Sequence, residues 1–396
     1  MPKDILGTNA KNNKKTRGRI KAGTVFELWS KAGGRCEFRG CNKPLWQEDL
    51  TCAKVNTSNI AHIIAASKNG PRGDKDLSPK LAGDITNLML LCKEHHTDII
   101  DKAQVDIYTV DKLRLMKKEH EDRILTVTSI IPEAKSKIVK YCSSIGERAI
   151  HISGKELACA LLPDRYPDGD IIELSLKSPW EDSEKIFWDV EEKSLRTQFN
   201  KKVKPYLQDN TIKHLSIFAL APQPLLMLLG SLFTDVYGAE VFQLKRTNNK
   251  QDWRWEKEFE EPDFIFEKPE KLRKKTPVLN LSLSGLNHNE RIEKILGNDC
   301  DIWTIKVKEP NTNVIKAKNQ LCAFKEIARK ALEEIKYNYP QGTPLNVFPL
   351  MPVSANVEFG RLILPRADMP MKIYNMNDKN KDFEYALTIN DKGRDK

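Results

Sequence analysis

The sequence predicts an α/β protein with two or three domains, and three observations carry this prediction. The chain has 396 residues, which is too long for one ordinary domain, and 40% of them are hydrophobic, which is enough for packed cores. Residues 58–101 combine two short apolar runs with a helical stretch rich in histidine and cysteine. The second half of the chain contains an internal repeat, in which apolar strands alternate with helices.

The charge of the chain favours a polyanionic partner. The net charge is +10 and the isoelectric point is about 9.0. Residues 1–23 hold seven basic side chains against one acidic side chain, so we expect a basic disordered arm that is able to touch DNA. The eight cysteines are dispersed and no signal peptide precedes them, which favours a reducing cytoplasm.

One uncharged segment, residues 215–234, is about as long as a membrane helix. Pro222 and Pro224 lie in its middle and divide it into a strand, a loop and a helix. We therefore expect no membrane span.

A short helix over residues 24–34 is predicted to end at glycines, and two pairs of metal-ligating side chains follow in the chain. Cys36 and Cys41 form the first pair, and Cys92 and His95 form the second. Two close ligand pairs separated by a structured insert are typical of a closed tetrahedral zinc site. Thiolates suit zinc better than magnesium, so these four residues are interpreted as a structural Cys3His site, with Cys52 as a less favoured substitute ligand.

The chemistry of phosphodiester hydrolysis needs a base and a hard cation. His62 closes the first apolar run and is the expected base, because a neutral imidazole accepts a proton at cellular pH. His96 follows zinc ligand His95 on the helix and is the expected ligand of the catalytic cation. Asn87 is expected to orient the loop of His62 through bonds to the backbone.

Two further polar residues of this stretch are Arg72 and Asp101. Arg72 lies in the loop sequence Asn-Gly-Pro-Arg-Gly and is expected to hold a DNA phosphate. Asp101 is interpreted as an ordinary residue of the helix end.

The order His62, Asn87, Cys92, His95, His96 in a strand–strand–helix pattern resembles the HNH endonuclease family. The resemblance implies a ββα-metal domain over residues 24–127, with a structural Zn²⁺ and a catalytic divalent cation, Mg²⁺ by preference. Many HNH enzymes carry an acidic or histidine ligand just before the base, where this chain has Ala61. The cation would then rest on His96, the substrate phosphate and water.

Residues 109–127 are predicted to form an amphipathic helix. Five side chains share its apolar face, and the histidine among them is interpreted as packing: Val110, Leu113, Met116, His120 and Ile124. Pro132 and a Lys/Ser-rich stretch then predict a linker over residues 128–140.

The remaining residues, 141–396, contain a repeat with a constant offset of 130 residues. It relates Phe218 to Phe348, Pro222 to Pro352 and Gly230 to Gly360. Strands at 240–244 and 372–376 follow the two copies, and a second match relates 172–177 to 279–284. With helices such as 314–338, the pattern predicts a tandem Rossmann-like pseudo-dimer, whose ligands bind at the carboxyl ends of parallel strands.

This arrangement resembles the SAVED domain, a fused pair of CARF-like units found in CBASS antiphage effectors. The likeness rests on residues 218–224, Arg246 with 253–255, 281–284 and 348–361. Together with the HNH unit it implies a cytoplasmic effector that stays silent until a cyclic oligonucleotide, made by a partner nucleotidyltransferase, binds residues 141–396. Members of this family then assemble into larger homo-oligomers and degrade double-stranded DNA.

A cyclic di- or trinucleotide offers flat bases for stacking and phosphates for basic side chains or helix-terminal amides. For most of the tryptophans, core packing is the better interpretation. The candidate ligand contacts are Lys177, Trp180, Gln223, Arg246, Trp253, Ser284, Ser354 and Arg361.

Three functions remain open from the residues. The first is a ligand-gated, metal-dependent DNA endonuclease. The second is a restriction-type HNH nuclease whose C-terminal half recognises DNA. The third is a non-catalytic, zinc-containing regulator that senses a nucleotide and binds DNA, which Ala61 favours slightly.

Overall fold

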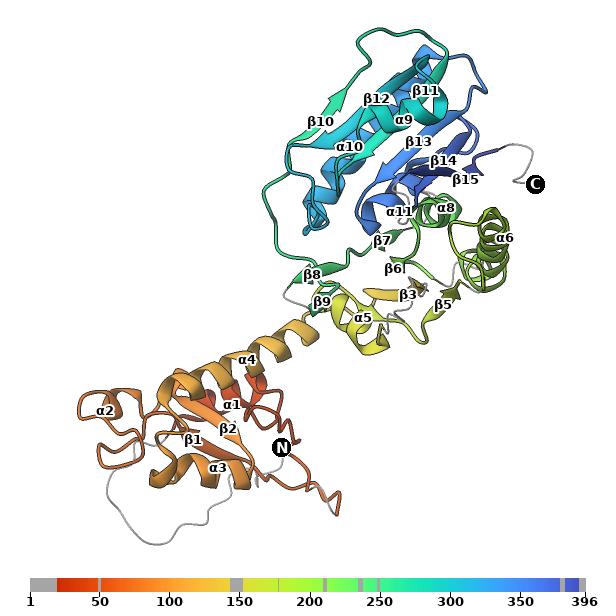
Figure 1. The fold of residues 1–396 in the computed structure, drawn as a ribbon. Helices are drawn as coiled ribbons and strands as arrows, with labels where there is room; N and C mark the ends of the chain where they lie inside the picture. Colours follow the sequence, from red (N-terminus) through yellow and green to blue (C-terminus); the bar gives the residue numbers. More distant parts are fainter. Residues whose placement is uncertain are drawn as a thin grey trace. The chain divides into compact units, whose positions relative to one another are not determined.

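The computed structural model describes residues 20–48, 51–142, 152–176, 178–208, 212–233, 238–247, 250–377 and 382–391. The chain divides into two compact units between Ile131 and Pro132 (Figure 1). The mixed helices and parallel strands confirm the α/β class.

The boundary between the units differs from the expected linker over residues 128–140. Strand β3 spans Lys135–Cys142, so the second unit begins before residue 141. The Lys/Ser-rich composition concealed this strand, because one of its serines is an interior residue. The Ser136 hydroxyl is buried and lies 2.7 Å from the Ser216 hydroxyl on a neighbouring strand.

The N-terminal unit is built on a small antiparallel hairpin followed by a helix. Strand β1 pairs with β2, with His62 opposite Leu88. The elements of this unit are α1 (Ala22–Lys31), β1 (Asn59–His62), α2 (Leu77–Leu81), η1 (Ile85–Asn87), β2 (Leu88–Leu91), α3 (Lys93–Ile100), η2 (Lys102–Gln104) and α4 (Val110–Thr128). All four residues of β2 are buried, so this strand forms the centre of the core.

Two helices cover this hairpin. Helix α1 already begins at Ala22, inside the segment expected to be a disordered arm, and residues 1–19 lie outside the described part of the chain. On α4, Leu113, Met116 and His120 are buried as the apolar periodicity predicts. The His120 Nε2 atom lies 2.9 Å from the Ala32 carbonyl oxygen, which supports a packing role for this imidazole.

The C-terminal unit contains two larger sheets. Its elements in the first half are β3 (Lys135–Cys142), α5 (Gly154–Ala160), β4 (Tyr166–Pro167), β5 (Ile172–Ser175), α6 (Lys185–Lys202), α7 (Lys204–Gln208), β6 (Leu215–Leu220), α8 (Gln223–Phe233), β7 (Ala239–Val241), β8 (Lys245–Thr247) and β9 (Lys250–Asp252). Those in the second half are β10 (Phe264–Glu267), β11 (Thr276–Ser282), α9 (Asn289–Leu296), β12 (Cys300–Val307), α10 (Lys318–Asn338), β13 (Leu345–Leu350), α11 (Val353–Leu362), β14 (Met371–Met376) and β15 (Phe383–Ile389).

The two sheets share one topology. Parallel strands run in the order β5-β3-β6-β7 in the first sheet and β12-β11-β13-β14 in the second. If the parallel strands of each sheet are numbered by their order in the chain, both sheets have the spatial order second, first, third, fourth. This is a doubly wound pattern, whose switch point lies between the first and third strands. The second sheet adds antiparallel edge strands β10 and β15. The predicted pair of α/β lobes is therefore present.

One of the two repeat matches is structurally correct. Strands β6 and β13 have bounds that differ by the offset of 130 residues, and helices α8 and α11 begin with the same offset. The match of 172–177 to 279–284 is wrong, because β5 is the outer neighbour of β3 whereas β11 lies next to β13. Both segments are apolar strands buried by sheet packing, and this shared environment produced the similarity.

Helices α8 and α11 lie against each other and join the two lobes (Figure 1). Two glycines lie at their crossing. A Cβ atom on Gly230 would lie 2.0 Å from the Val357 carbonyl oxygen, and one on Gly360 would lie 2.0 Å from the Met227 carbonyl oxygen. Val357 and Met227 are themselves 130 residues apart, so the contact is reciprocal. Each repeat thus donates the same helix surface to a pseudo-twofold contact.

Within the described residues, no helix is long and apolar enough to cross a membrane. The segment that contains Pro222 and Pro224 forms β6, a short connection and α8, as predicted.

Candidate functional site

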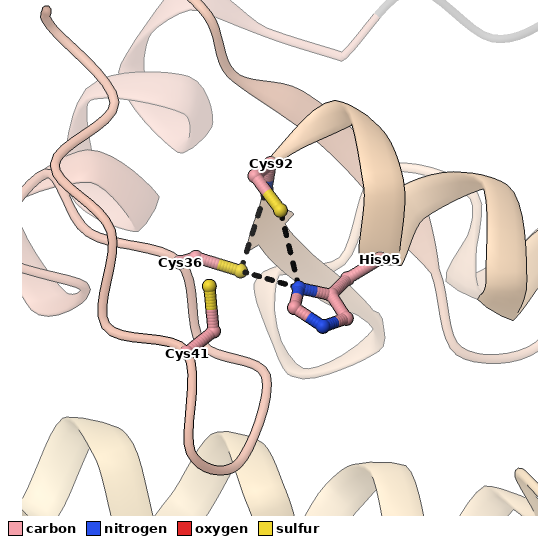
Figure 2. A group of neighbouring side chains, drawn as sticks. All are labelled: Cys36, Cys41, Cys92 and His95. Atoms are coloured by element: carbon pink, nitrogen blue, oxygen red, sulfur yellow. Dashed lines mark hydrogen bonds between the residues drawn. The ribbon is translucent and has the colours of Figure 1, made fainter. Parts of the chain in front are cut away.

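Four metal-ligating side chains meet beside the hairpin of the N-terminal unit (Figure 2). Cys36 and Cys41 come from the loop after α1, where Gly40 adopts a positive φ of 86° as the chain turns back. Cys92 is the N-cap of α3, and His95 lies in the first turn of that helix. Their ligand atoms all lie within 4.8 Å of one another.

The distances inside this group are near those around a tetrahedral ion, and the pair of His95 and Cys92 is closer than the ideal. His95 Nδ1 lies 3.1 Å from Cys92 Sγ and 3.8 Å from Cys36 Sγ. A zinc ion with bonds of about 2.3 Å to sulfur and about 2.0 Å to nitrogen needs ligand separations of roughly 3.5–3.8 Å. The His95 ring also stacks on Phe38, at 3.9 Å between ring centroids, which fixes the orientation of the imidazole.

Burial raises the pKa of the Cys36 thiol strongly and that of Cys41 as well, with the neighbouring thiols adding to the effect. These two thiols are therefore costly to ionise without a cation beside them. The donor set of three sulfurs and one imidazole is that of a structural zinc site. Cys52, the weaker alternative, is exposed and does not belong to the group.

His62 lies at the end of β1, and a backbone carbonyl fixes its tautomer. Its Nε2 atom lies 2.9 Å from the Ala82 carbonyl oxygen. A carbonyl only accepts hydrogen bonds, so Nε2 carries a hydrogen. In the neutral imidazole the lone pair is then on Nδ1, which is the atom that accepts a proton.

His96 lies on α3 near β1. Burial lowers the pKa of His96, and the neighbouring His62 lowers it further. The backbone of Ile60, two residues before His62 on β1, acts in the opposite direction and raises the pKa of His96. A neutral imidazole has a lone pair on one ring nitrogen, so His96 has the chemistry of a ligand for a cation.

Asn87 holds the segments on either side of His62. Its side-chain oxygen accepts a hydrogen bond from the Ile64 amide at 2.8 Å, and its nitrogen donates to the carbonyls of Ile64 at 2.9 Å and Leu81 at 3.2 Å. Leu81 precedes Ala82, whose carbonyl orients the His62 ring. The side chain thus positions the loop, as the sequence predicts.

The residue before His62 supplies no ligand to this pair. Ala61 is buried in the core of the N-terminal unit. In the part of the chain that the structure describes, Cys36, Cys41, Cys92 and His95 form the only group of three or more side chains able to hold a metal ion. A cation at His96 would therefore need oxygens from substrate and water.

The guanidinium of Arg72 is directed at backbone carbonyls, which does not favour the expected contact with a DNA phosphate. Its three guanidinium nitrogens donate to the carbonyls of Ile63, Ile99 and Tyr108. Asp101 is a local cap, because its side chain accepts a hydrogen bond from the Ala103 amide, in agreement with its plain interpretation.

In the C-terminal unit, two of the expected ligand contacts lie near one edge of the second sheet. Ser284 follows β11, and its amide donates to the Leu350 carbonyl at the end of β13. Arg246 is exposed on β8, and its backbone is bonded to Asn313 in the loop after β12. The backbone amide of Asn311 in that loop donates a hydrogen bond to the Leu283 carbonyl, which connects the loop near Arg246 to the chain just before Ser284. This edge is the switch point of the second lobe.

Four other expected ligand contacts are internal packing residues. The Ser354 hydroxyl donates to Gln243, and the Gln223 side-chain oxygen accepts from the Met351 amide. Arg361 donates to Glu358 and to the Ala239 carbonyl. Trp253 is buried against Phe218, which agrees with its alternative interpretation as core. Their partners inside the protein thus account for these side chains without a ligand.

The last two expected ligand contacts are Trp180 and Lys177. Trp180 is 39% exposed in the turn before α6, so its ring is accessible for stacking. Lys177 lies outside the described residues.

The sequence interpretation missed a buried asparagine pair at the same edge. The Asn280 side chain on β11 donates to the Asn287 carbonyl at 2.9 Å, and the Asn287 side chain donates back to Asn280 at 3.0 Å. Among the described residues, the side-chain oxygen of Asn287 has no hydrogen-bond partner. A polar residue inside the apolar run Leu-Asn-Leu-Ser-Leu was the available signal.

The fold and the site define a protein that joins a Cys/His-rich hairpin-and-helix unit to a twin α/β unit. Residues 195–389 match the family described as the SMODS-associated and fused to various effectors sensor domain, SAVED. The C-terminal region of this chain therefore contains a SAVED domain. A comparison with curated proteins finds no match.

Similar solved structures are SAVED/CARF-domain containing receptors named Cap4. The receptor of Acinetobacter baumannii with the cyclic trinucleotide 2'3'3'-cAAA is 10% identical, with a TM-score of 0.41, and the alignment covers 75% of this chain and 60% of that one. A second structure of this receptor is 11% identical, with a TM-score of 0.40, and the alignment covers 80% of this chain and 65% of that one. The receptor of Moraxella osloensis is 11% identical, with a TM-score of 0.36, and the alignment covers 72% of this chain and 59% of that one. The chain thus spans 60 to 65% of the length of the first two receptors.

Proposed function

We propose that this protein is a metal-dependent endonuclease that cuts double-stranded DNA when a cyclic oligonucleotide occupies its SAVED domain, as an effector of antiphage defence. The observation that carries the nuclease part is the pair His62 and His96, which are electrostatic neighbours on β1 and α3, with His62 Nε2 held by the Ala82 carbonyl. The sensor part is supported by the SAVED match of residues 195–389.

The geometry supports hydrolysis of a phosphodiester with His62 as the base. A water oxygen attacks phosphorus, its proton moves to His62 Nδ1, and the bond from phosphorus to the leaving oxygen breaks. A divalent cation held by His96, Mg²⁺ by preference, would neutralise charge on the phosphate and the leaving oxygen. Asn87 keeps the Ala82 carbonyl in place, and this carbonyl keeps Nε2 protonated.

The Cys36, Cys41, Cys92 and His95 group would hold a structural zinc ion. Its role would be mechanical, because it joins the loop after α1 to the first turn of α3. The hairpin-and-helix unit is small, and a bound metal contributes directly to the folding of such units.

The ligand of the SAVED domain is proposed to be a cyclic di- or trinucleotide made by a partner nucleotidyltransferase. The similar receptor of Acinetobacter baumannii is named with a cyclic trinucleotide. Ser284 and Arg246 lie at the carboxyl edge of the second sheet, where doubly wound folds bind nucleotides. Ligand binding is expected to enlarge the homo-oligomer, which light scattering with and without ligand would measure.

The test uses purified full-length protein, plasmid DNA, Mg²⁺ or Mn²⁺, and a panel of cyclic di- and trinucleotides. Wild-type protein should cut only when the cation and one activating nucleotide are both present. His62→Ala should bind that nucleotide with unchanged affinity by calorimetry. It should leave the plasmid intact, because the variant lacks the base that takes the proton from the attacking water. Thr97→Ala is the matched control, since Thr97 is exposed on the same helix as His96.

Cutting by His62→Ala at the wild-type rate would remove the catalytic assignment. Cutting by wild-type protein without any nucleotide, together with DNA binding by residues 132–396, would instead support a restriction-type nuclease with a DNA-recognising C-terminal unit.

A non-catalytic regulator is a second candidate, and one observation favours it. Ala61 is buried, and among the described residues no third His, Cys, Asp or Glu side chain completes a metal group with His62 and His96. This regulator would bind zinc, sense a nucleotide and bind DNA. It predicts that every nucleotide and cation tested leaves the plasmid intact while DNA affinity changes with the nucleotide.

A further inference from the structure

One arginine connects the two elements that carry the histidine pair. Arg72 donates from Nε to the Ile63 carbonyl at 2.6 Å, from Nη2 to the Ile99 carbonyl at 2.9 Å and from Nη1 to the Tyr108 carbonyl at 3.2 Å. Ile63 directly follows His62 at the end of β1. Ile99 lies in the last turn of α3, the helix that carries His96. A single planar group therefore spans the strand, the helix and the chain before α4.

The residue type suits this task. The guanidinium presents donors in a rigid fork, and it stays protonated although burial lowers its pKa. The last carbonyls of a helix have no partner inside the helix, and a cation at that end is also favoured by the helix dipole. Arg72 thus satisfies an orphan carbonyl of α3 and adds a favourable charge there.

The loop after β1 is shaped to deliver this side chain. A Cβ on Gly70 would lie 2.5 Å from Ala65 Cβ, and one on Gly73 would lie 2.5 Å from the Ser67 carbonyl oxygen. Arg72 itself adopts a positive φ of 54°, which is uncommon outside glycine. The chain folds tightly here, and the arginine side chain reaches the interior carbonyls.

The opposite end of α3 has a separate attachment. Cys92 and His95 belong to the metal group at the first turn of the helix, whereas Ile99 lies in its last turn. The eight-residue helix is thus held at both ends, and His96 lies between the two attachments. Fixing only one end would leave the helix free to tilt against β1.

We propose that Arg72 is a positioning residue that sets the placement of His96 on α3 against His62 on β1, and that it does not contact DNA. This inference rests on the proposed nuclease function. It replaces a role in phosphate binding by a role in holding two imidazoles at a fixed separation.

The test compares Arg72→Lys and Arg72→Gln in the full-length protein. Lysine keeps the charge but cannot reach three carbonyls, and glutamine removes the charge. Arg39→Gln is the control, because Arg39 makes an exposed pair with Glu119 in the same unit. For each variant we would measure the zinc content, the long-range ¹H–¹⁵N spectrum of ¹⁵N-histidine-labelled protein, and kcat and KM for plasmid cutting.

In wild-type protein, the His62 nitrogens should show the Nε2–H tautomer. Both Arg72 variants should keep their zinc, shift the signals of His62 and His96 toward averaged tautomers, and lower kcat by about 10- to 100-fold while KM changes little. Arg39→Gln should match the wild type in all three measurements.

Two results would overturn the inference. Unchanged His62 and His96 signals with a raised KM and a weaker salt dependence would identify Arg72 as a phosphate contact. Loss of zinc from both variants would show that Arg72 supports the whole domain. If wild-type protein cuts no DNA, the proposed function fails, but the histidine spectra still decide whether Arg72 positions the pair.

Discussion

Histidine 214 illustrates how single buried residues make this protein sensitive to pH. Its Nδ1 atom lies 2.9 Å from the Ser136 hydroxyl, at the start of the first sheet of the C-terminal unit. Burial lowers the pKa of His214 to about 4, and the positive charges of Arg165, Lys318 and Arg361 act in the same direction. The folded protein therefore keeps this imidazole neutral at pH values where an unfolded chain protonates it.

The sign of the resulting pH dependence follows from the lowered pKa. An unfolded histidine titrates near pH 6.5, so its stabilising contribution is fully present above that pH and is lost as the pH falls toward about 4. His214→Gln should remove this part of the acid sensitivity. Thermal unfolding midpoints of full-length protein between about pH 7 and pH 4.5 would measure it.

His288→Gln is the control for this measurement, because His288 is an exposed N-cap residue of α9. It should keep the wild-type dependence on pH. If His214→Gln loses as much stability on acidification as the wild type does, another group is responsible.

At the scale of elements, the metal group determines whether the hairpin and helix of the N-terminal unit stay together. The two ligand pairs come from the loop before β1 and from the start of α3. Cys41→Ser should lose the metal and unfold this unit, while the C-terminal unit keeps its own melting transition. Metal content by mass spectrometry and circular dichroism on heating would check both statements.

Cys52→Ser provides the matched control, since Cys52 is exposed and lies outside the group. It should retain one metal ion per chain. If Cys41→Ser kept its metal ion and the melting transition of the N-terminal unit, the group of Cys36, Cys41, Cys92 and His95 would not be a structural metal site.

The crossing of α8 and α11 is a second feature at this scale. Gly230→Ala and Gly360→Ala should each lower the free energy of unfolding by about 1–3 kcal/mol, because the added methyl group meets backbone atoms of the other helix. The two losses should be similar, since the contact is reciprocal. Urea unfolding of the C-terminal unit would measure them.

Gly285→Ala serves as the comparison, because its Cβ would meet only Leu350 Cδ1, at an ordinary 3.9 Å. Its stability should stay close to that of the wild type. A neutral Gly230→Ala would mean that the helices separate at little cost, and that the lobes are not joined rigidly there.

At the scale of the whole molecule, each unit has a hydrophobic core of its own. One core cluster contains only residues before Ile131, and the others contain only residues after Pro132. A domain with its own core folds independently in principle. The exact starting residue of the second unit decides whether this core is complete.

Two fragments test this statement. Residues 132–396 should fold and bind the activating nucleotide, whereas residues 141–396 should be unstable. The shorter fragment lacks most of β3, which pairs with β4, β5 and β6 and buries Ile138 and Val139. Size-exclusion chromatography and circular dichroism would compare them, and equal melting temperatures would contradict the boundary drawn at Pro132.

Much of the architecture was predictable because its signals are local or periodic. The spacing of Cys36, Cys41, Cys92 and His95 indicates a metal group, and the structure brings the four together. The constant offset from Gly230 to Gly360 indicates a duplicated unit. Hydrophobic periodicity also placed α4, since Leu113 and Met116 repeat at the helical spacing.

The tertiary structure alone decided which polar side chains remain available for a ligand. Ser354 is bound to Gln243, 111 residues away, and Gln223 to Met351, 128 residues away. Arg72 is bound to carbonyls from three separate segments. A sequence states which donors and acceptors a chain carries, but the partner of a buried polar group comes from segments that only the folded chain brings into contact.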